Sequence, residues 1–457
     1  MGEGIPPSDE EIMTQSPQEE PNLTEIQRDN GRAPKKSSGL LIGGAVLFVI
    51  LVLIGLFLPP ISLGSRLSGN NDQTAVTNEE ANSTPEPAAA ANPSIPGEIT
   101  LTVTGDAVVN VAGMSLSDFV AANASAAMPA EAAVQGNVYV LNYEGDAPTG
   151  QVTLNVPAGI TAAETLDLLG WNGSTWQFVP NDLDAANQQI MSHADKLPQA
   201  YALVVLPAPA APELSAEILP EQTLPVDLLP IVTQVVLGKL SLASGGTMEG
   251  SAATMPTGAY SQYLAASNTG AMINAADLAT VLNDSAARTN QINTLVTAVQ
   301  SGGFAGLNLD YQEVAAADSA AFTQFVSDLA DALRQQGLKL ALTLGTPQFS
   351  GSSWNTGGQD WAALGRLADE IYVQMPLDPS TYENGGLADQ VLAWAVRQID
   401  RQKLNMLVSA NAINRVGESF VELPNDQALS NFGELAFVQG SEAVEPGTAV
   451  EVALSGT

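Results

Sequence analysis

The chain has 457 residues, of which 45% are hydrophobic and only 14% charged. Lysine and arginine number 15 against 49 aspartates and glutamates, so the formal net charge is −34 and phosphate backbones are repelled. We therefore expect no nucleic-acid partner. The sequence has no cysteine and a single histidine, His193, which argues against disulfides, thiolate metal sites and multi-histidine metal sites. We expect neither a metal nor a cofactor, and any chemistry must come from carboxylates, amides, hydroxyls and aromatic rings.

The N-terminal part is typical of a membrane anchor. Residues 1–38 are polar and predict a disordered tail. Within 39–60, the uncharged apolar run Leu40 to Leu58 would be about 28 Å long as a helix, close to the thickness of the hydrocarbon core of a bilayer. Four basic residues precede this run and only Arg66 follows it closely. The positive-inside rule therefore predicts a single-pass protein of the cell membrane with a cytoplasmic N-terminus and extracellular domains. The acidic, cysteine-free composition suggests a bacterial cell envelope.

The segment that follows predicts a stalk and a small β-domain. Residues 61–96 are rich in Pro, Ala and Asn, a composition that predicts a stalk. Residues 97–208 contain several alternating runs, and Asn172-Gly173 favours a type I′ hairpin turn. We expect an antiparallel β-sandwich here, followed by a Pro/Ala-rich linker at 209–224.

Residues 225–420 alternate between strand and helix patterns. This alternation predicts the α/β class with a parallel sheet, either a (β/α)8 TIM-type barrel or a doubly wound layer. Residues 421–457 read as a β-rich insertion or the start of a further domain. No eighth barrel strand is evident, so the barrel is incomplete, the chain is a fragment, or the tail belongs to another domain.

One stretch carries candidate chemistry. Because side chains alternate along a strand, Asn308, Asp310 and Gln312 share one face. Polar groups at the carboxyl end of a barrel strand are where barrel enzymes hold catalytic residues, although a solvated strand end would show the same pattern. The same alternation points Glu313 to the opposite face, unless a bulge after Tyr311 turns it inward.

The stretch from Gly302 to Val314 resembles the fourth-strand signature F-D-G-x-D/N-x-D-x-E of family 18 glycoside hydrolases, the chitinase-like barrels. It is most similar to the branch of spore-germination cell-wall hydrolases. The stretch from Glu370 to Asp378 resembles that branch's sixth-strand motif, and the likeness covers roughly residues 225–415. The resemblance implies a TIM-type barrel and O-glycosyl hydrolase chemistry on amino-sugar polymers.

Three positions depart from the family pattern. The family's general-acid glutamate aligns with Gln312, its first aspartate with Ala305 and its sixth-strand tyrosine with Leu377. Asp310 would orient the substrate's acetamido group, as the resemblance implies. An amide at Gln312 has no proton to give to the leaving oxygen, so the chain is expected to be a pseudoenzyme. Glu313 is the alternative acid.

A site of this kind can still bind sugar. Residues with suitable hydrogen-bonding or stacking groups complete the expected set: Asn308, Gln374, Met375, Asp378 and Trp354. The partner is then a cell-wall or extracellular amino-sugar glycan. Two alternatives stay open, an active glycosidase of peptidoglycan or chitin-like chains, and a structural spacer that meets a partner in a surface assembly.

Overall fold

A computed structural model describes residues 92–424 and 427–428, apart from gaps at 124–125, 130–131, 208–212, 219–223, 252–257 and 271. The expected cytoplasmic tail and membrane helix, and the expected stalk up to residue 91, lie outside the described residues. None of the helices within 92–424 combines the length and the apolar character that a membrane crossing requires. All of the described residues belong to one compact unit, 87–457.

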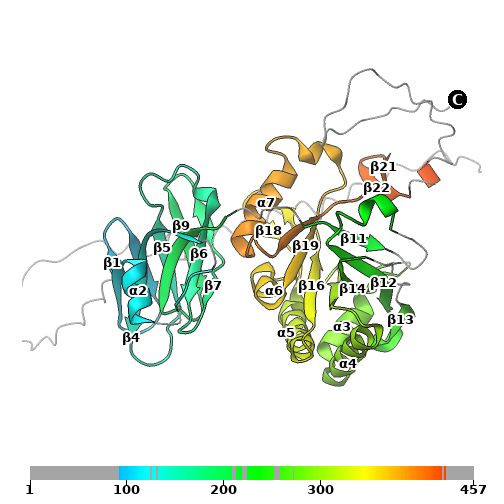
Figure 1. The fold of residues 1–457 in the computed structure, drawn as a ribbon, viewed down its shortest axis with the longest axis horizontal. Helices are drawn as coiled ribbons and strands as arrows, with labels where there is room; N and C mark the ends of the chain where they lie inside the picture. The colour runs from blue at the N-terminus through cyan, green and yellow to red at the C-terminus, as the bar shows by residue number, and fades with distance from the viewer. Residues whose placement is uncertain are drawn as a thin grey trace, which may run out of the picture. The chain divides into compact units, whose positions relative to one another are not determined.

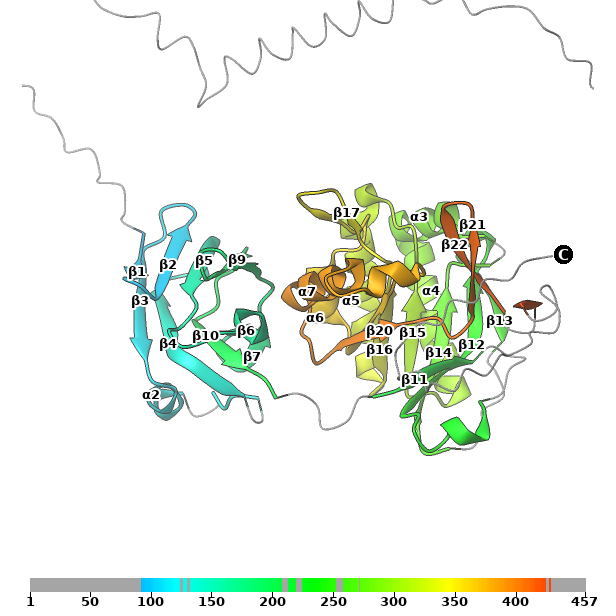
Figure 2. The ribbon, with the colours of Figure 1, turned by 90° about the horizontal axis from the view of Figure 1, so that it is seen from above.

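Residues 94–205 form two five-stranded antiparallel sheets (Figure 2). The first has the order β1 (Ser94–Ile95), β2 (Ile99–Val103), β5 (Gly150–Asn155), β9 (Gln189–Ala194) and β8 (Asp182–Asp184). The second has the order β3 (Val109–Met114), β4 (Ala133–Tyr143), β10 (Ala200–Val205), β6 (Leu166–Trp171) and β7 (Trp176–Phe178), and helix α2 (Leu116–Ala122) follows β3. Buried side chains of both sheets, Leu101 and Leu168 among them, form one shared core. Trp171 pairs with Trp176, so the expected hairpin is present, and Gly173 in its turn has φ 97°. The expected type I′ turn is not formed, because that type also needs a positive φ at Asn172, which is not among the residues with positive φ.

The rest of the described chain is a mixed α/β structure with an eight-stranded sheet. Seven strands run parallel in the order β11 (Ser215–Ile218), β12 (Gln234–Leu242), β14 (Ser261–Ser267), β15 (Gly306–Asp310), β16 (Lys339–Leu344), β19 (Glu370–Gln374) and β20 (Leu404–Leu407). Strand β13 (Met248–Ser251) pairs antiparallel with β12. Two hairpins, β17 (Gln348–Phe349) with β18 (Trp354–Asn355) and β21 (Ala412–Val416) with β22 (Ser419–Leu423), stand apart from this sheet.

Helices connect the parallel strands and cover the outer face of the sheet (Figure 1). They are α3 (Ala275–Asn283), α4 (Ser285–Gly302), α5 (Ser319–Gln335), α6 (Trp361–Leu367) and α7 (Leu387–Gln398). The expected α/β class is confirmed. Closure into a (β/α)8 barrel is not seen, because β11 and β20 are the two ends of the sheet and no eighth parallel strand joins them in the described part of the chain.

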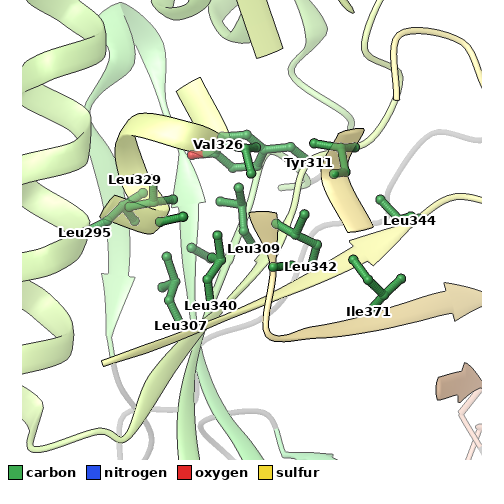
Figure 3. Close-up of a cluster of buried hydrophobic side chains, with 14 of the residues drawn as sticks. Leu295, Leu307, Leu309, Tyr311, Val326, Leu329, Leu340, Leu342, Leu344 and Ile371 are labelled. Atoms are coloured by element: carbon green, nitrogen blue, oxygen red, sulfur yellow. The ribbon is translucent and has the colours of Figure 1, made fainter. Parts of the chain in front are cut away.

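Strand β15 shows how the sheet positions the candidate site. Leu307, Leu309 and Tyr311 point toward the helix layer, where Val326 and Leu329 of α5 lie, as seen in Figure 3. All five side chains are at most 1% exposed, which anchors this strand firmly in the apolar core. Strand alternation then turns Asn308 and Asp310 to the opposite, inner face of the sheet.

A polar network lies on this inner face, near the amino ends of the parallel strands. The Gln234 Nε2 atom donates to the Tyr372 hydroxyl at 2.8 Å. The hydroxyls of Tyr263 and Tyr372 donate to the two carboxylate oxygens of Glu370 at 2.9 and 3.2 Å. Burial raises the pKa of both tyrosines, so they stay protonated donors. The carboxyl ends of the strands lie beyond this network and form the open end of the inner face.

Helix α7 is joined to strand β6 and its neighbours by buried arginine contacts. The Arg397 guanidinium, in a residue that is 5% exposed, donates to the carbonyl oxygens of Leu166 at 2.8 Å and Ala163 at 3.1 Å. Arg401 forms an ion pair with Asp167 at 2.8 Å. Five donors on one planar group make arginine suited to such convergent carbonyl contacts. These bonds tie the α/β part to the β-sheets of residues 94–205.

Candidate functional site

A cavity of about 590 Å³ opens at the carboxyl ends of the parallel strands, a volume typical of small-molecule sites. Polar and charged groups predominate in its lining. The residues that bear those side chains are Lys239, Thr269, Asp310, Gln312, Glu313, Thr346, Gln348, Asn355, Thr356, Gln359 and Gln374. They come from β12, β15 and β19, from the β17–β18 hairpin, and from the loops that follow β14, β15, β16 and β18.

Asp310 and Gln312 form the centre of the site. The Gln312 Nε2 atom donates to Oδ1 of Asp310 and, at 3.2 Å, to the carbonyl oxygen of Thr343 on β16. The backbone of Gln312 is held by Asn268, whose fully buried amide accepts from the Gln312 N–H and donates to the Gln312 carbonyl oxygen, both at 2.8 Å. A side chain at Gly345 would come within 2.6 Å of Gln312 Oε1, so this glycine leaves room for the amide. The sequence pattern placed both side chains on one face, and the structure brings them into direct contact.

The charge state of Asp310 follows from its surroundings. Burial raises the pKa of its carboxyl above the ordinary value, and this effect is the largest one. The hydrogen bond from Gln312 and the ammonium of Lys239 act in the opposite direction and favour the ionised form. The carboxyl of Glu217 on β11 also lies near Asp310, and its own pKa is raised by burial and by the Asp310 charge.

This raised pKa predicts a pH-dependent contribution to stability. A carboxyl whose pKa is higher in the folded than in the unfolded chain stabilises the fold below the unfolded pKa of about 3.9, and that contribution is lost as the pH rises through the folded pKa. In the Asp310→Asn variant this loss is absent. Between pH 4 and pH 7 we expect the Tm of the variant to fall less, or rise more, than the Tm of the unchanged protein. Scanning calorimetry checks this, and the reverse order would show that the folded pKa is lowered.

The placement of Glu313 corrects an expectation. Strand alternation assigned it to the face opposite Asp310, but strand β15 ends at Asp310 and the alternation no longer applies at Glu313. Glu313 adopts φ 53°, a left-handed conformation that is uncommon for a residue other than glycine. Its exposed side chain lines the same cavity as Asp310 and Gln312. The carboxylates of Asp310 and Glu313 and the amide of Gln312 therefore border the same open space.

The other expected binding residues divide into two groups. Gln374 lines the cavity. Asn308 lies on β15 two residues before Asp310, where its side chain accepts from the Thr343 hydroxyl at 3.2 Å. Met375 is instead buried in the apolar core at 5% exposure. Asp378 turns back on its own chain and accepts from the Ser380 backbone N–H at 2.9 Å.

Trp354 does not line the cavity. Its ring is stacked on Trp394 of α7, with centroids 5.6 Å apart and an angle of 25° between the ring planes. Phe349 packs on it with centroids 5.0 Å apart, and Trp361 packs against Trp394 at 4.9 Å. On the β17–β18 hairpin the neighbouring polar residues Gln348 and Asn355 line the cavity instead.

Two functional residues were missed in the sequence. The buried Gln359 amide accepts from the Gly345 N–H at 3.0 Å and donates to the Tyr311 carbonyl at 3.0 Å, which ties the ends of β15 and β16 together. Nothing in its sequence neighbourhood signals that role. Lys239 did carry a signal, because it is a lone cation that follows a glycine within an otherwise apolar strand pattern.

Comparison with known proteins gives several likenesses. No family model matches the chain. A stretch of 93 residues, 20% of the chain, is 30% identical to the Bacillus subtilis (strain 168) protein described as "Putative sporulation-specific glycosylase YdhD" and covers 22% of it. Among solved structures, the spore cortex-lytic enzyme SleL of Bacillus cereus is 17% identical, with a TM-score of 0.40 over 70% of this chain and 81% of that chain. A chitinase from Chromobacterium violaceum is 22% identical, with a TM-score of 0.39 over 48% of this chain and 76% of that one.

The match to the Bacillus subtilis protein described as a sporulation-specific glycosylase confirms the resemblance drawn from the sequence. The match spans 22% of that relative, so the activity, substrate and partners of this chain are matters for proposal. That Gln312 occupies the position of the family's catalytic glutamate stays a prediction.

Proposed function

We propose that this chain is a membrane-anchored, extracytoplasmic protein whose α/β part is a degenerate, family 18-type barrel that binds an amino-sugar glycan of the cell envelope without hydrolysing it. Residues 39–60 would hold it in the membrane, with residues 1–38 in the cytoplasm and the described domains outside the cell. The observation that carries the non-hydrolytic reading is the Gln312 amide, which hydrogen-bonds Asp310 where a general acid would be needed.

The chemistry of Gln312 supports binding over turnover. In the resembled family, a carboxylic acid protonates the leaving oxygen while the substrate's acetamido carbonyl attacks the anomeric carbon. A glutamine can hydrogen-bond the glycosidic oxygen but cannot transfer a proton, and general acid catalysis contributes about 10²–10⁴-fold to such reactions. The remaining groups, Asp310 and Gln374 among them, still offer hydrogen bonds to a sugar.

A second candidate function is supported by one observation. Glu313 lines the cavity beside Asp310, so an ionisable acid is present within the site although its position in the chain is shifted by one residue. An active glycosidase would use Glu313 to protonate the leaving oxygen. The β-sheets of residues 94–205 and the acidic surface would suit a structural role in a surface assembly if neither binding nor turnover occurs.

Titration calorimetry of the purified protein separates these functions. Hexamers of N-acetylglucosamine should bind saturably, and hexamers of glucose with the same linkage should bind at least ten-fold more weakly, because they lack the acetamido group that Asp310 would orient. Product analysis of the same samples should show intact sugar. Cleavage that the Glu313→Gln variant abolishes would establish the glycosidase instead, and the absence of both binding and cleavage would leave the structural role.

A further inference from the structure

We propose that Lys239 is a ligand-contacting residue of this cavity, which donates to the acetamido carbonyl of an amino sugar whose N–H is accepted by Asp310. The inference rests on the proposed glycan binding and specifies the chemical group that is recognised. It concerns a residue that the resemblance to glycoside hydrolases does not point to.

A β-bulge places Lys239 in the cavity. Strands β12 and β14 pair in register up to Leu237, the register shifts, and pairing resumes at Leu240 opposite Ala266. Gly238 is the extra residue and has φ 71°, a conformation that glycine adopts without cost. Without the bulge, alternation would place Lys239 on the same face as Leu237, which is buried in the apolar core under the helices.

The shift moves the lysine to the inner face. It lies level with Ala265 of β14, which belongs to the buried cluster on that face, and it lines the cavity together with Asp310 and Gln312. Bulges of this kind re-aim a single side chain and are frequent next to active sites. The strand departs from regular pairing at the one point where this brings a cation into the site.

The Lys239 ammonium has unused donors. Among the described residues no hydrogen bond and no ion pair engages it, and it acts on Asp310 and Glu217 only through longer-range attraction. The residue is half-buried, and an ammonium has three donors that need acceptors when water is displaced. A ligand acceptor next to Asp310 would meet that need.

An acetamido group fits the pair of charges. A secondary amide presents one donor and one acceptor side by side, so its N–H can face a carboxylate while its carbonyl faces an ammonium. Gln312 occupies Oδ1 of Asp310, and no hydrogen bond within the described residues engages Oδ2. Both contacts are charge-assisted and therefore among the stronger hydrogen bonds. A hydroxyl at the same sugar position can also donate and accept, but from a single oxygen atom, whereas the amide presents its donor and its acceptor on two separate atoms.

The same contact has a chemical consequence. In the resembled family the acetamido carbonyl oxygen is the nucleophile, as stated for the family's mechanism. A carbonyl that accepts from an ammonium has less electron density to give to the anomeric carbon. Lys239 would therefore favour tight binding of the amino sugar and disfavour the attack step. This agrees with a site that has the amide of Gln312 in place of a general acid.

The alternative is that Lys239 contacts no ligand and only neutralises the negative charges around it. The charged groups that face Asp310 are Lys239 from β12, Glu217 from β11 and Glu313 from the loop after β15. A pure balancing role would make the Lys239→Met variant less stable or change its pH dependence, but the variant would not choose differently between acetylated and free amino sugars. Ligand choice is therefore the decisive readout.

The test uses the full-length protein and two trimers, one of N-acetylglucosamine and one of glucosamine with free amines. In the Lys239→Met variant we expect the affinity for the acetylated trimer to fall about ten-fold or more, the size expected for a lost charge-assisted hydrogen bond. Affinity for the glucosamine trimer should stay the same or rise, because a like charge has been removed. Lys239→Gln, whose amide can donate to the carbonyl, should recover part of the loss.

Lys339→Met is the matched control. Lys339 lies at the opposite end of the sheet, where its side chain is 62% exposed and pairs with Glu370 at 3.8 Å, so its replacement should change neither affinity. Equal affinity of the Lys239→Met variant and the unchanged protein for the acetylated trimer would overturn this inference and leave glycan binding intact. An equal loss for both trimers would also overturn it, since a folding defect acts on both. Failure of the unchanged protein to bind either trimer would overturn the proposed function as well.

Discussion

Replacing Gln312 by glutamate should raise the rate at which N-acetylglucosamine oligomers are cleaved by about 10²-fold over the unchanged protein. The new carboxyl would lie against Asp310, where the Gln312 amide now donates. Two neighbouring carboxylates cannot easily both ionise, so one of them keeps its proton at neutral pH and can act as the general acid. The low end of the range for acid catalysis is expected because Leu377 stands where the family has a tyrosine.

The gain should depend on the surroundings of the new acid. Adding Lys239→Met to the Gln312→Glu variant should raise the rate further, because the acetamido carbonyl would no longer donate its electron density to an ammonium. Adding Glu313→Gln should leave the rate unchanged. The measurement is chromatography of fluorescently labelled oligomers over several hours. Equal rates for the unchanged protein and the Gln312→Glu variant would contradict the assignment of residue 312 to the acid position.

Replacing Arg397 by methionine should lower the free energy of unfolding by about 3 kcal/mol. The guanidinium donates to the carbonyl oxygens of Leu166 and Ala163 within a nearly fully buried environment. Methionine keeps most of the volume but removes the donor to the Leu166 carbonyl and to Oδ1 of Asn181, while the Ala163 carbonyl keeps the Leu166 N–H, and each buried group left unsatisfied costs about 1–3 kcal/mol. Arg397 is 5% exposed, and this burial lowers the pKa of its guanidinium.

Urea unfolding followed by tryptophan fluorescence measures this loss, since tryptophans lie both in β6–β7 and in α6–α7. The control is Arg366→Met, because Arg366 is exposed on α6 and its replacement should change stability by no more than about 0.5 kcal/mol. Equal stability of the Arg397→Met and Arg366→Met variants would show that these contacts do not hold the two parts together.

The sequence pattern was sufficient where the orientation of the side chains depends on a single helix or strand. The spacing of Phe322, Phe325, Val326, Leu329 and Leu333 predicts the buried face of α5, and all five are buried. The alternation in β15 correctly assigns Tyr311 to the helix layer, where it stacks on Phe325 with centroids 5.9 Å apart. In both cases burial of an apolar face fixes the orientation of the polar residues opposite.

The sequence pattern failed at positions where contacts between elements decide the orientation of the side chain. Glu313 reaches the cavity because β15 ends at Asp310, and where a strand ends depends on its neighbours. Lys239 reaches it through a bulge that exists only relative to the register with β14. Trp354 does not line the cavity because it stacks on Trp394, which lies on a helix and follows it by 40 residues in the chain. The candidate site is therefore a property of the assembled sheet, of which the sequence revealed the Asp310 and Gln312 centre and Gln374.

Native mass spectrometry of the purified protein with an N-acetylglucosamine hexamer distinguishes binding from hydrolysis, because it reports bound ligand and cleaved ligand in the same spectrum. We expect a complex of the protein with one intact hexamer, still intact after a day of incubation, and a weaker signal in the Asp310→Ala variant. Accumulation of shorter sugars that the Glu313→Gln variant stops would contradict the claim of a non-hydrolytic site.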